Sequence, residues 1–322
     1  MGPGITMNSM SYIDRGNKSL AFFLANAGYD IWLVNWRGTR FSRGHVTLSP
    51  DNRKFWKIGF HDMAVHDLKT ITNLVHAETG RKAIYIGFSM GSTVGFIYNI
   101  REQKSAEKTL KTIIHLAPIA RFDHSTSLLK YLSPLWPLVR PLIMIIWNGE
   151  VFPYNKHSTF FCRPFPFQIK LCESFLKPFF GRNLQHTDPL TYPITNIQNR
   201  DSIATGTIDH YAQIIQSNRF AEYNYGVIEN LKKYHQAKPP LYEFRELTLP
   251  QIMFVGEQDI MATIEDTRKI YDLIPKKSKC GYYTLKNFDH SDFVISKNAV
   301  EVYYHKLLSA IQDTDSGRCR NN

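Results

Sequence analysis

The 322-residue sequence lacks most short motifs that indicate a metal, nucleotide or dinucleotide site. Its four cysteines form no C-x-x-C pair, which excludes the common structural zinc sites. Neither G-x-x-x-x-G-K-[ST] nor G-x-G-x-x-G occurs, so phosphate-binding loops of those two kinds are excluded. His61 and His66 are five residues apart, not four as in the zinc motif H-E-x-x-H. We therefore expect no metal ion and no cofactor.

The sequence also lacks the patterns of a secretion signal and of a membrane span. Its first thirty residues contain no basic stretch followed by an apolar one. The longest apolar run, 131–147, is interrupted by Pro134, Pro137, Arg140 and Pro141, so a continuous transmembrane helix of about 20 residues is not expected. We expect no signal peptide in the chain as given and no transmembrane segment.

A net charge of +11 raises the question of an anionic partner. The lysines and arginines are scattered, the densest group being Lys232, Lys233 and Lys238, and no nucleic-acid-binding motif is present. A generally basic surface is the simpler interpretation, and we expect no nucleic-acid partner. With 43% hydrophobic residues, the composition is that of an ordinary globular protein with one large domain or a domain with an insertion.

Strand-like and helix-like segments alternate in the first and last parts of the chain. This rhythm predicts an α/β fold with a mostly parallel sheet covered by helices on both faces. The middle of the chain is aromatic-rich and punctuated by prolines, which predicts an inserted, mainly helical cap. We expect core segments at 1–120 and 251–322, a cap at 121–250, strands at 29–36, 83–86, 112–116, 251–255 and 281–285, and helices at 18–27, 61–78, 91–100, 264–273 and 299–311.

The stretch "IYIGFSMGST" places Gly87-Phe88-Ser89-Met90-Gly91 between a predicted strand and a predicted helix. This is the setting of a nucleophile elbow, in which two glycines allow a strand to turn abruptly into a helix with the serine at the apex. The alternative is a tight turn with a capping serine. The setting favours Ser89 as a nucleophile.

A nucleophilic serine needs a histidine base, and the histidine needs an orienting carboxylate. After such an elbow, the acid precedes the histidine along the chain. Asp259 follows the predicted strand 251–255, and His290 follows the strand 281–285, where the carboxyl ends of parallel strands gather ligands. His305, the other late histidine, falls inside the last helix. We predict Asp259 as the acid and His290 as the base.

The tetrahedral intermediate also needs two N–H donors for its oxyanion. The backbone N–H of Met90, the residue after the serine, is the first. The second comes from a loop that, in this chain, is the extreme N-terminus "GPGITM", and we predict the N–H of Ile5.

Several longer stretches carry a resemblance to a known family. The phrases "FWKIGFHDMAVHDL", "IGFSMGST", "HLAPIA", "QIMFVGEQDIMA" and "FDHSDF" resemble the acid lipases, a family of α/β-hydrolases that includes gastric and lysosomal acid lipase. The resemblance implies cofactor-free hydrolysis of esters of insoluble lipids, such as triacylglycerols or sterol esters, at a lipid–water interface. It also implies Ser89, Asp259 and His290 as nucleophile, acid and base.

The resemblance further implies a secreted or lysosomal glycoprotein. Cys162 and Cys172 fall near a bridged pair of the family, although spacing alone does not decide whether they pair. Asn17, in the sequon Asn-Lys-Ser, would be a glycosylation site on the secretory route. This sequence differs from the family at Phe88 and Met90, where histidine and glutamine are usual.

The beginning of the chain departs most from the family. Acid lipases carry a signal peptide and three strands before a His-Gly-Leu segment, of which only 3–5 corresponds here. We therefore expect an unpaired edge on the strand 83–86, and an unstable chain. Two functions stay open: a lipase or esterase, or a catalytically impaired protein that only binds an apolar ligand. A peptidase or thioesterase on the same fold is a third class.

Overall fold

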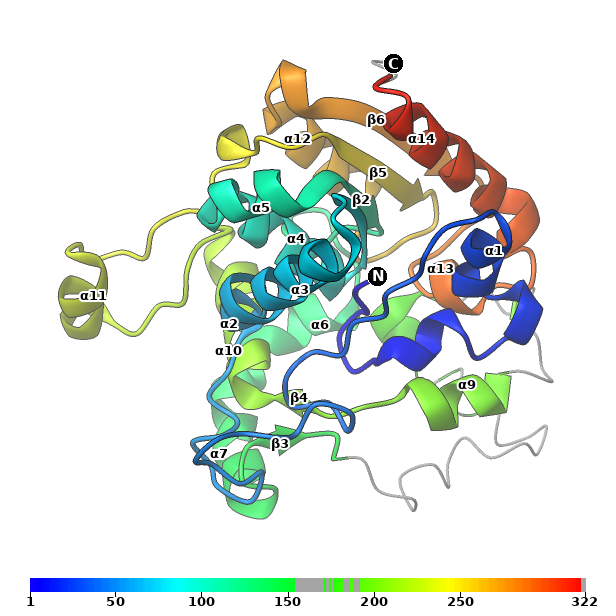
Figure 1. Cartoon of the computed structure of the whole chain (residues 1–322). Coiled ribbons are helices and arrows are strands. Elements are labelled where there is room, and N and C mark those ends of the chain that lie inside the picture. Colours follow the sequence, from blue (N-terminus) through cyan, green and yellow to red (C-terminus); the bar gives the residue numbers. More distant parts are fainter. Residues whose placement is uncertain (154–170, 172–173, 175, 182–185, 188–191, 320–322) are drawn as a thin grey trace.

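The computed structural model describes residues 1–153, 171, 174, 176–181, 186–187 and 192–319 (Figure 1). A four-stranded sheet forms its centre, with strand order β1-β2-β5-β6 and every neighbouring pair parallel. The strands are β1 (Ala83–Phe88), β2 (Leu110–Leu116), β5 (Gln251–Gly256) and β6 (Lys279–Leu285). The predicted α/β fold with a parallel sheet is confirmed.

Helices cover both faces of this sheet (Figure 1). Helix α3 (Lys69–Thr79) ends at Gly80, whose φ of +66° provides the left-handed cap expected of a glycine. The other core helices are α1 (Leu20–Asn26), α4 (Met90–Arg101), α5 (Gln103–Thr109), α12 (Ile264–Leu273), α13 (Asp292–Ile295) and α14 (His305–Asp315). Shorter turns of helix are η1 (Ser9–Tyr12), η2 (Gly16–Lys18), α2 (Phe60–Asp62), the π-helical η3 (Met63–Leu68), η6 (Phe244–Glu246), η7 (Lys276–Ser278) and the π-helical η8 (Val300–Tyr304).

Between β2 and β5 the chain leaves the sheet, and its described residues there are mostly helical. These are α6 (Leu128–Leu132), η4 (Ser133–Leu135), α7 (Trp136–Ile146), α9 (Tyr192–Asn199), α10 (Thr205–Ser217) and α11 (Val227–Tyr234), with a small antiparallel pair β3 (Glu150–Val151) and β4 (Ile203–Ala204). Asp209 of α10 accepts hydrogen bonds from Trp136 and Arg140, which fixes α7 against α10.

The apolar run in this region is helical, as expected of the cap, but it is continuous, whereas we expected its prolines to interrupt it. Residues Leu128–Ile146 form 19 continuous helical residues with a mean hydropathy of 1.2, and only 11% of that window is buried. Pro134 and Pro137 lie in the first turns of η4 and α7, where a missing N–H costs no hydrogen bond, so these two prolines do not stop the helix. By length and composition alone, this stretch is able to cross a membrane.

The predicted strand 29–36 and the predicted unpaired edge of β1 also need correction. Gly2 pairs in parallel with Gly87: its N–H donates to Ile86 O at 2.8 Å, and Phe88 N–H donates to Gly2 O at 3.0 Å. The β1 edge is therefore paired at its carboxyl end. The segment 29–36 is not assigned as a strand, because a strand needs a continuous hydrogen-bonded neighbour, and among the described residues only Met1 pairs with it, at Trp32 and Val34.

One disulfide joins Cys280 in β6 to Cys319 near the end of the chain, 39 residues apart. The spacing of the cysteines along the sequence does not predict this pair. The predicted pair Cys162 and Cys172 lies outside the described residues.

Candidate functional site

Ser89 occupies a sharp turn between β1 and α4. Its φ of 52° and ψ of −114° are unfavourable for a residue with a side chain and cost about 1–3 kcal/mol, so the surroundings must enforce them. Those surroundings need both flanking glycines. A Cβ on Gly87 would lie 2.5 Å from the backbone of Gly91, and a Cβ on Gly91 would lie 2.2 Å from the carbonyl oxygen of Gly2. The Ser89 side chain caps no helix N–H, so the capping alternative does not describe this turn.

Of the three residues predicted for a catalytic triad, His290 lies within hydrogen-bond distance of both Ser89 and Asp259. His290 Nε2 is 2.9 Å from Ser89 Oγ, and His290 Nδ1 is 2.8 Å from Asp259 Oδ2. The other carboxylate oxygen, Asp259 Oδ1, accepts from the N–H groups of Met261 and Ala262 at 2.8 Å each. Because both oxygens are engaged, the carboxylate is fixed, and with it the orientation of the imidazole ring.

The loops that carry the acid and the histidine hold each other in place. Gln258 N–H donates to Phe288 O at 2.9 Å, and Glu257 N–H donates to Leu285 O at 3.0 Å. Gly256 allows this close approach, because a Cβ there would lie 2.2 Å from Phe288 O. The strands β5 and β6 thus deliver Asp259 and His290 to the carboxyl edge of the sheet, where Ser89 follows β1.

All three side chains are almost inaccessible to water, with exposed fractions of 3% for Ser89, 3% for His290 and 5% for Asp259. Hydrogen bonds in such a dry setting are stronger than in water. The centroid of the Phe88 ring lies 5.3 Å from that of the His290 ring, and the two rings pack against each other. His305, the alternative base, is exposed in α14, and its ring contacts Phe23 at 5.2 Å.

The two predicted oxyanion donors flank the same serine. Met90 is the first residue of α4, where backbone N–H groups have no partner inside the helix. Gly4 passes so close that a Cβ there would lie 3.3 Å from Ser89 Cβ, and Ile5 follows it. The chain therefore brings Ile5 beside Ser89. The pairing of Gly2 with β1 fixes the position of the residues that lead to Ile5.

Two cavities meet at Ser89. The larger, about 320 Å³, has an almost entirely apolar lining that includes Ser89, Phe122, Leu129, Trp136, Tyr211 and Met261. The smaller, about 120 Å³, is bounded by Ser89, His290, Leu176, Phe180, Asn199 and Arg200. Ile5 lines both. The serine therefore lies between an apolar chamber and a more polar one.

Tyr211, which lines the larger cavity, is hydrogen-bonded to α4, the helix that follows Ser89. Its hydroxyl is 2.9 Å from Thr93 Oγ1 in α4, and burial raises the pKa of the phenol well above its usual range. The group therefore stays neutral and acts as a hydrogen-bonding partner.

One group of potential metal ligands occurs among the described residues. Ligand atoms of Asp123, His124 and Asp266 lie within 4.8 Å of one another. Arg121 and Lys269 already neutralise Asp123, and His124 Nδ1 is 2.8 Å from Asp266. These contacts account for the group as an ion-pair network between the loop after β2 and α12.

Comparisons with known proteins point to one family. The profile described as "alpha/beta hydrolase fold" matches residues 3–293. Gastric triacylglycerol lipase of Rattus norvegicus is 31% identical over 305 residues, covering 92% of this chain and 75% of that protein. Lipase member K of Mus musculus is 29% identical over 308 residues, with 92% and 75% covered.

Solved structures agree with the fold. The α/β hydrolase GrgF from Penicillium has a TM-score of 0.57 at 15% identity, covering 99% of this chain and 89% of that one. Monoacylglycerol lipase of Paleococcus ferrophilus has a TM-score of 0.51 at 15% identity, covering 97% and 93%. At this identity the likeness concerns the fold alone.

Proposed function

Because the chain is a carboxylic ester hydrolase of the acid lipase family of α/β-hydrolases, we propose that it cleaves the carboxylic esters of lipids through Ser89, His290 and Asp259. The observation that carries this proposal is the position of His290. Its ring lies between Ser89 Oγ at 2.9 Å and Asp259 at 2.8 Å, at the point where an apolar cavity begins.

In the first half-reaction, Ser89 Oγ attacks the ester carbonyl carbon while its proton passes to His290 Nε2. Asp259 accepts a hydrogen bond from the Nδ1–H of His290 and stabilises the imidazolium. The oxyanion binds the N–H groups of Met90 and Ile5. When the tetrahedral intermediate collapses, His290 gives its proton to the leaving alcohol, and an acyl-serine ester remains. Water then attacks the acyl carbon and gives a proton to His290 Nε2. When this second tetrahedral intermediate collapses, the bond to Ser89 Oγ breaks, His290 returns the proton to Oγ, and the fatty acid leaves. No cofactor takes part.

The two cavities suggest where the two parts of an ester substrate bind. The larger apolar cavity suits a fatty acyl chain, and the smaller cavity, which has Asn199, Arg200 and His290 in its lining, suits the alcohol portion. Triacylglycerols and sterol esters both have this construction. A peptide substrate would leave the amide groups of its side chains and backbone unpaired in the apolar cavity.

We further propose that residues 121–250 form a cap that meets the lipid–water interface. The helices α6, η4 and α7 expose a set of large apolar side chains: Tyr131, Leu135, Leu138, Leu142, Ile145 and Ile146. Exposed apolar faces of this extent are uncommon on monomers that remain in water. Leu129, Leu135 and Trp136 from the same helices line the larger cavity, so this surface borders the proposed acyl site.

The disulfide between Cys280 and Cys319 supports a secreted or lysosomal location, since structural disulfides persist mainly in oxidising compartments. Asn17 is exposed in η2, so its side chain is accessible for glycosylation on that route.

The decisive experiment combines a fluorophosphonate probe with lipid hydrolysis. We expect the wild-type protein to be labelled and to release fatty acid from trioctanoylglycerol or cholesteryl oleate emulsions. Ser89→Ala should lose both, whereas Ser49→Ala, at an exposed loop serine, should keep both. Equal labelling of Ser89→Ala, or an unreactive wild type, would reject the proposal. Amide and thioester substrates of the same chain length test the peptidase and thioesterase classes.

The second candidate is a hydrolase-like protein that binds an apolar ligand without turnover. The observation that favours it is the apolar cavity of about 320 Å³ at Ser89, which would hold an apolar chain with or without turnover. A wild-type protein that binds a fluorescent fatty acid but does not react with the fluorophosphonate would support this candidate.

A further inference from the structure

His290 lies in a four-residue turn that has an aspartate at each end. Asp289 precedes the histidine, and Asp292, two residues after it, is the first residue of α13. Both are deeply buried, with exposed fractions of 2% for Asp289 and 1% for Asp292. Carboxylates are rarely buried to this extent unless neighbouring groups donate hydrogen bonds to them. Neither is the acid of the proposed triad, so their burial beside His290 needs a separate explanation.

The two aspartates bind each other's backbone. Asp289 Oδ1 accepts from the N–H groups of Ser291 at 2.9 Å and of Asp292 at 3.0 Å. In return, Asp292 Oδ2 accepts from Asp289 N–H at 2.9 Å. This reciprocal pattern is a capping box, in which two side chains three residues apart each bind the backbone N–H of the other. It closes a ring that contains His290 and Ser291, so the backbone of the histidine is fixed within its own turn.

Contacts from outside the turn add to this fixation. Gln258 N–H, in the loop that carries Asp259, donates to Phe288 O at 2.9 Å. His186, in the segment proposed as the cap, has its Nδ1 3.0 Å from Asp292 Oδ2, the oxygen that also accepts from the turn. His186 is held in turn, because Lys297 N–H donates to its carbonyl oxygen at 2.9 Å. Asp292 therefore links the turn, α13 and the proposed cap.

The position of the His290 backbone matters because the ring has two distances to keep. Asp259 fixes the direction of the imidazole through the contact of 2.8 Å, but it does not hold the backbone. Nε2 must stay near 2.9 Å from Ser89 Oγ to accept its proton. A misplacement of about 1 Å at a reacting group costs about 100-fold in rate. His290 lies in neither β6 nor α13, so regular secondary structure does not supply this rigidity.

We propose that Asp289 and Asp292 are positioning residues for His290, and that His186 secures Asp292 from the side of the cap. Neither aspartate lines the two cavities at Ser89, so both act through the histidine. The inference rests on the proposed function, because a positioned imidazole matters to the rate only if His290 is the base. A capping box that served only to stabilise α13 would support a helix of four residues and would leave the rate unchanged.

Steady-state kinetics on a soluble ester, together with the rate of fluorophosphonate labelling, tests the proposal on the whole protein. Asp292→Ala removes the acceptor of Asp289 N–H. We expect kcat and the labelling rate to fall about 50-fold, with KM changed by less than about twofold. Asp292→Asn keeps an amide oxygen that can replace Oδ2, so it should be about tenfold faster than Asp292→Ala. Asp289→Ala and Asp289→Asn form a second pair with the same expectation, since Asn and Asp are equally good caps.

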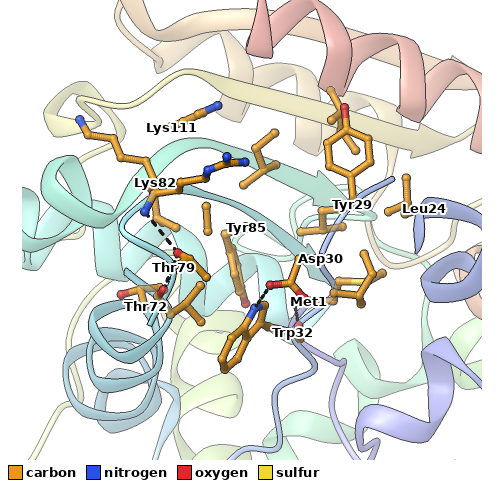
Figure 2. Close-up of a pocket in the computed structure, with 18 of the residues that line it drawn as sticks. Met1, Leu24, Tyr29, Asp30, Trp32, Thr72, Thr79, Lys82, Tyr85 and Lys111 are labelled. Atoms are coloured by element: carbon orange, nitrogen blue, oxygen red, sulfur yellow. Dashed lines mark hydrogen bonds between the residues drawn. The ribbon is translucent and has the colours of Figure 1, made fainter. Parts of the chain in front are cut away.

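Asp30→Ala is the matched control. Asp30 Oδ2 accepts from Trp32 Nε1 at 2.9 Å, beside a cavity of about 700 Å³ whose lining includes neither Ser89 nor His290 (Figure 2). This variant also loses an aspartate that accepts a hydrogen bond, but at a distance from the proposed triad. We expect its kcat, KM and labelling rate to equal those of the wild type.

The outcomes separate this inference from the proposed function. If the wild type is labelled but Asp292→Ala keeps kcat within about threefold, or only raises KM, the positioning role is overturned and the proposed function stands. Equal losses in Asp292→Ala and Asp292→Asn would also overturn it. An unreactive wild type would reject the proposed function and this inference with it.

His186→Phe decides the matter if Asp292→Ala does not fold, as judged by circular dichroism. The change removes one donor to Asp292 from a side chain that is 14% exposed, so folding should be retained. We expect kcat to fall about fivefold with KM unchanged. An unchanged kcat in His186→Phe would then overturn the proposal.

Discussion

Replacing Gly91 with alanine tests how the elbow and the first residues of the chain depend on each other. The added methyl would lie 2.2 Å from Gly2 O and 2.9 Å from Gly2 C, whereas ordinary contact begins near 3.4 Å. Both atoms belong to the backbone, so no side-chain rotation relieves the clash. The segment that begins with Gly2 must move by about 1 Å.

That movement disturbs three hydrogen bonds of Gly2: those to Ile86 and Phe88 of β1, and the one that Tyr12 donates to its carbonyl oxygen at 2.8 Å. Each of the three hydrogen bonds contributes about 1 kcal/mol net, and overpacking costs about 1–3 kcal/mol. Together these effects lower the stability of the fold by about 4–6 kcal/mol. Alanine gains up to about 1 kcal/mol over glycine in a helix. The cost of the clash exceeds this gain, so the free energy of unfolding falls by about 3–5 kcal/mol.

The assay is thermal unfolding followed by circular dichroism, together with the rate of fluorophosphonate labelling. With about 2 °C per kcal/mol for a domain of this size, Tm should fall by about 6–10 °C. Since the displaced segment carries Ile5, the labelling rate should fall about 100-fold, as for the loss of an oxyanion donor. Gly44→Ala is the control, because no atom lies within 4 Å of its added methyl. If Gly91→Ala behaved like Gly44→Ala in both measurements, the steric argument would be refuted.

Three further predictions concern the acid, the buried histidines and the cavity. Asp259→Asn should lower kcat for a soluble ester about 10⁴-fold with KM nearly unchanged, because the amide favours the wrong imidazole tautomer. Steady-state kinetics measures both constants, and a loss of kcat of tenfold or less would contradict Asp259 as the acid. Burial lowers the pKa of His115 and His210 to about 3, so the unfolded chain binds more protons below pH 6.5 and stability falls with acidification. Between pH 6 and 4, the free energy of unfolding measured with denaturant should fall by about 1.4 kcal/mol per pH unit for each of these two histidines. His210→Phe should remove one half of this joint contribution. Trp136→Ala should reduce hydrolysis of octanoate esters more than of acetate esters, since the side chain lines the acyl cavity; equal effects would argue against that use of the cavity.

The central part of the fold was predictable because its pattern is local. A run of apolar β-formers followed by Gly-x-Ser-x-Gly and a helical pattern defines β1, the turn and α4 within twenty residues. The chain order of acid and histidine then selected Asp259 and His290, and the structure brings both to Ser89. Their roles in catalysis stay predictions until the variants are measured.

Features that depend on distant partners were not predictable. Segment 29–36 has the composition of a strand, yet pairing is a property of two segments and its neighbour is two residues long. Nothing in the sequence around Cys280 indicates Cys319 as its partner, since four cysteines allow three complete pairings. Pro134 and Pro137 were misleading because the effect of a proline depends on its place within a turn of helix.

The positive φ of Ser89 means that the protein is less stable than its own fold permits. A glycine at this position would adopt the same backbone conformation at little cost, and the chain would gain stability of about 1 kcal/mol or more. The same change would remove the hydroxyl on which the proposed ester cleavage depends. Selection for stability alone would therefore replace Ser89, so its presence in this unfavourable conformation fits the catalytic role proposed for it.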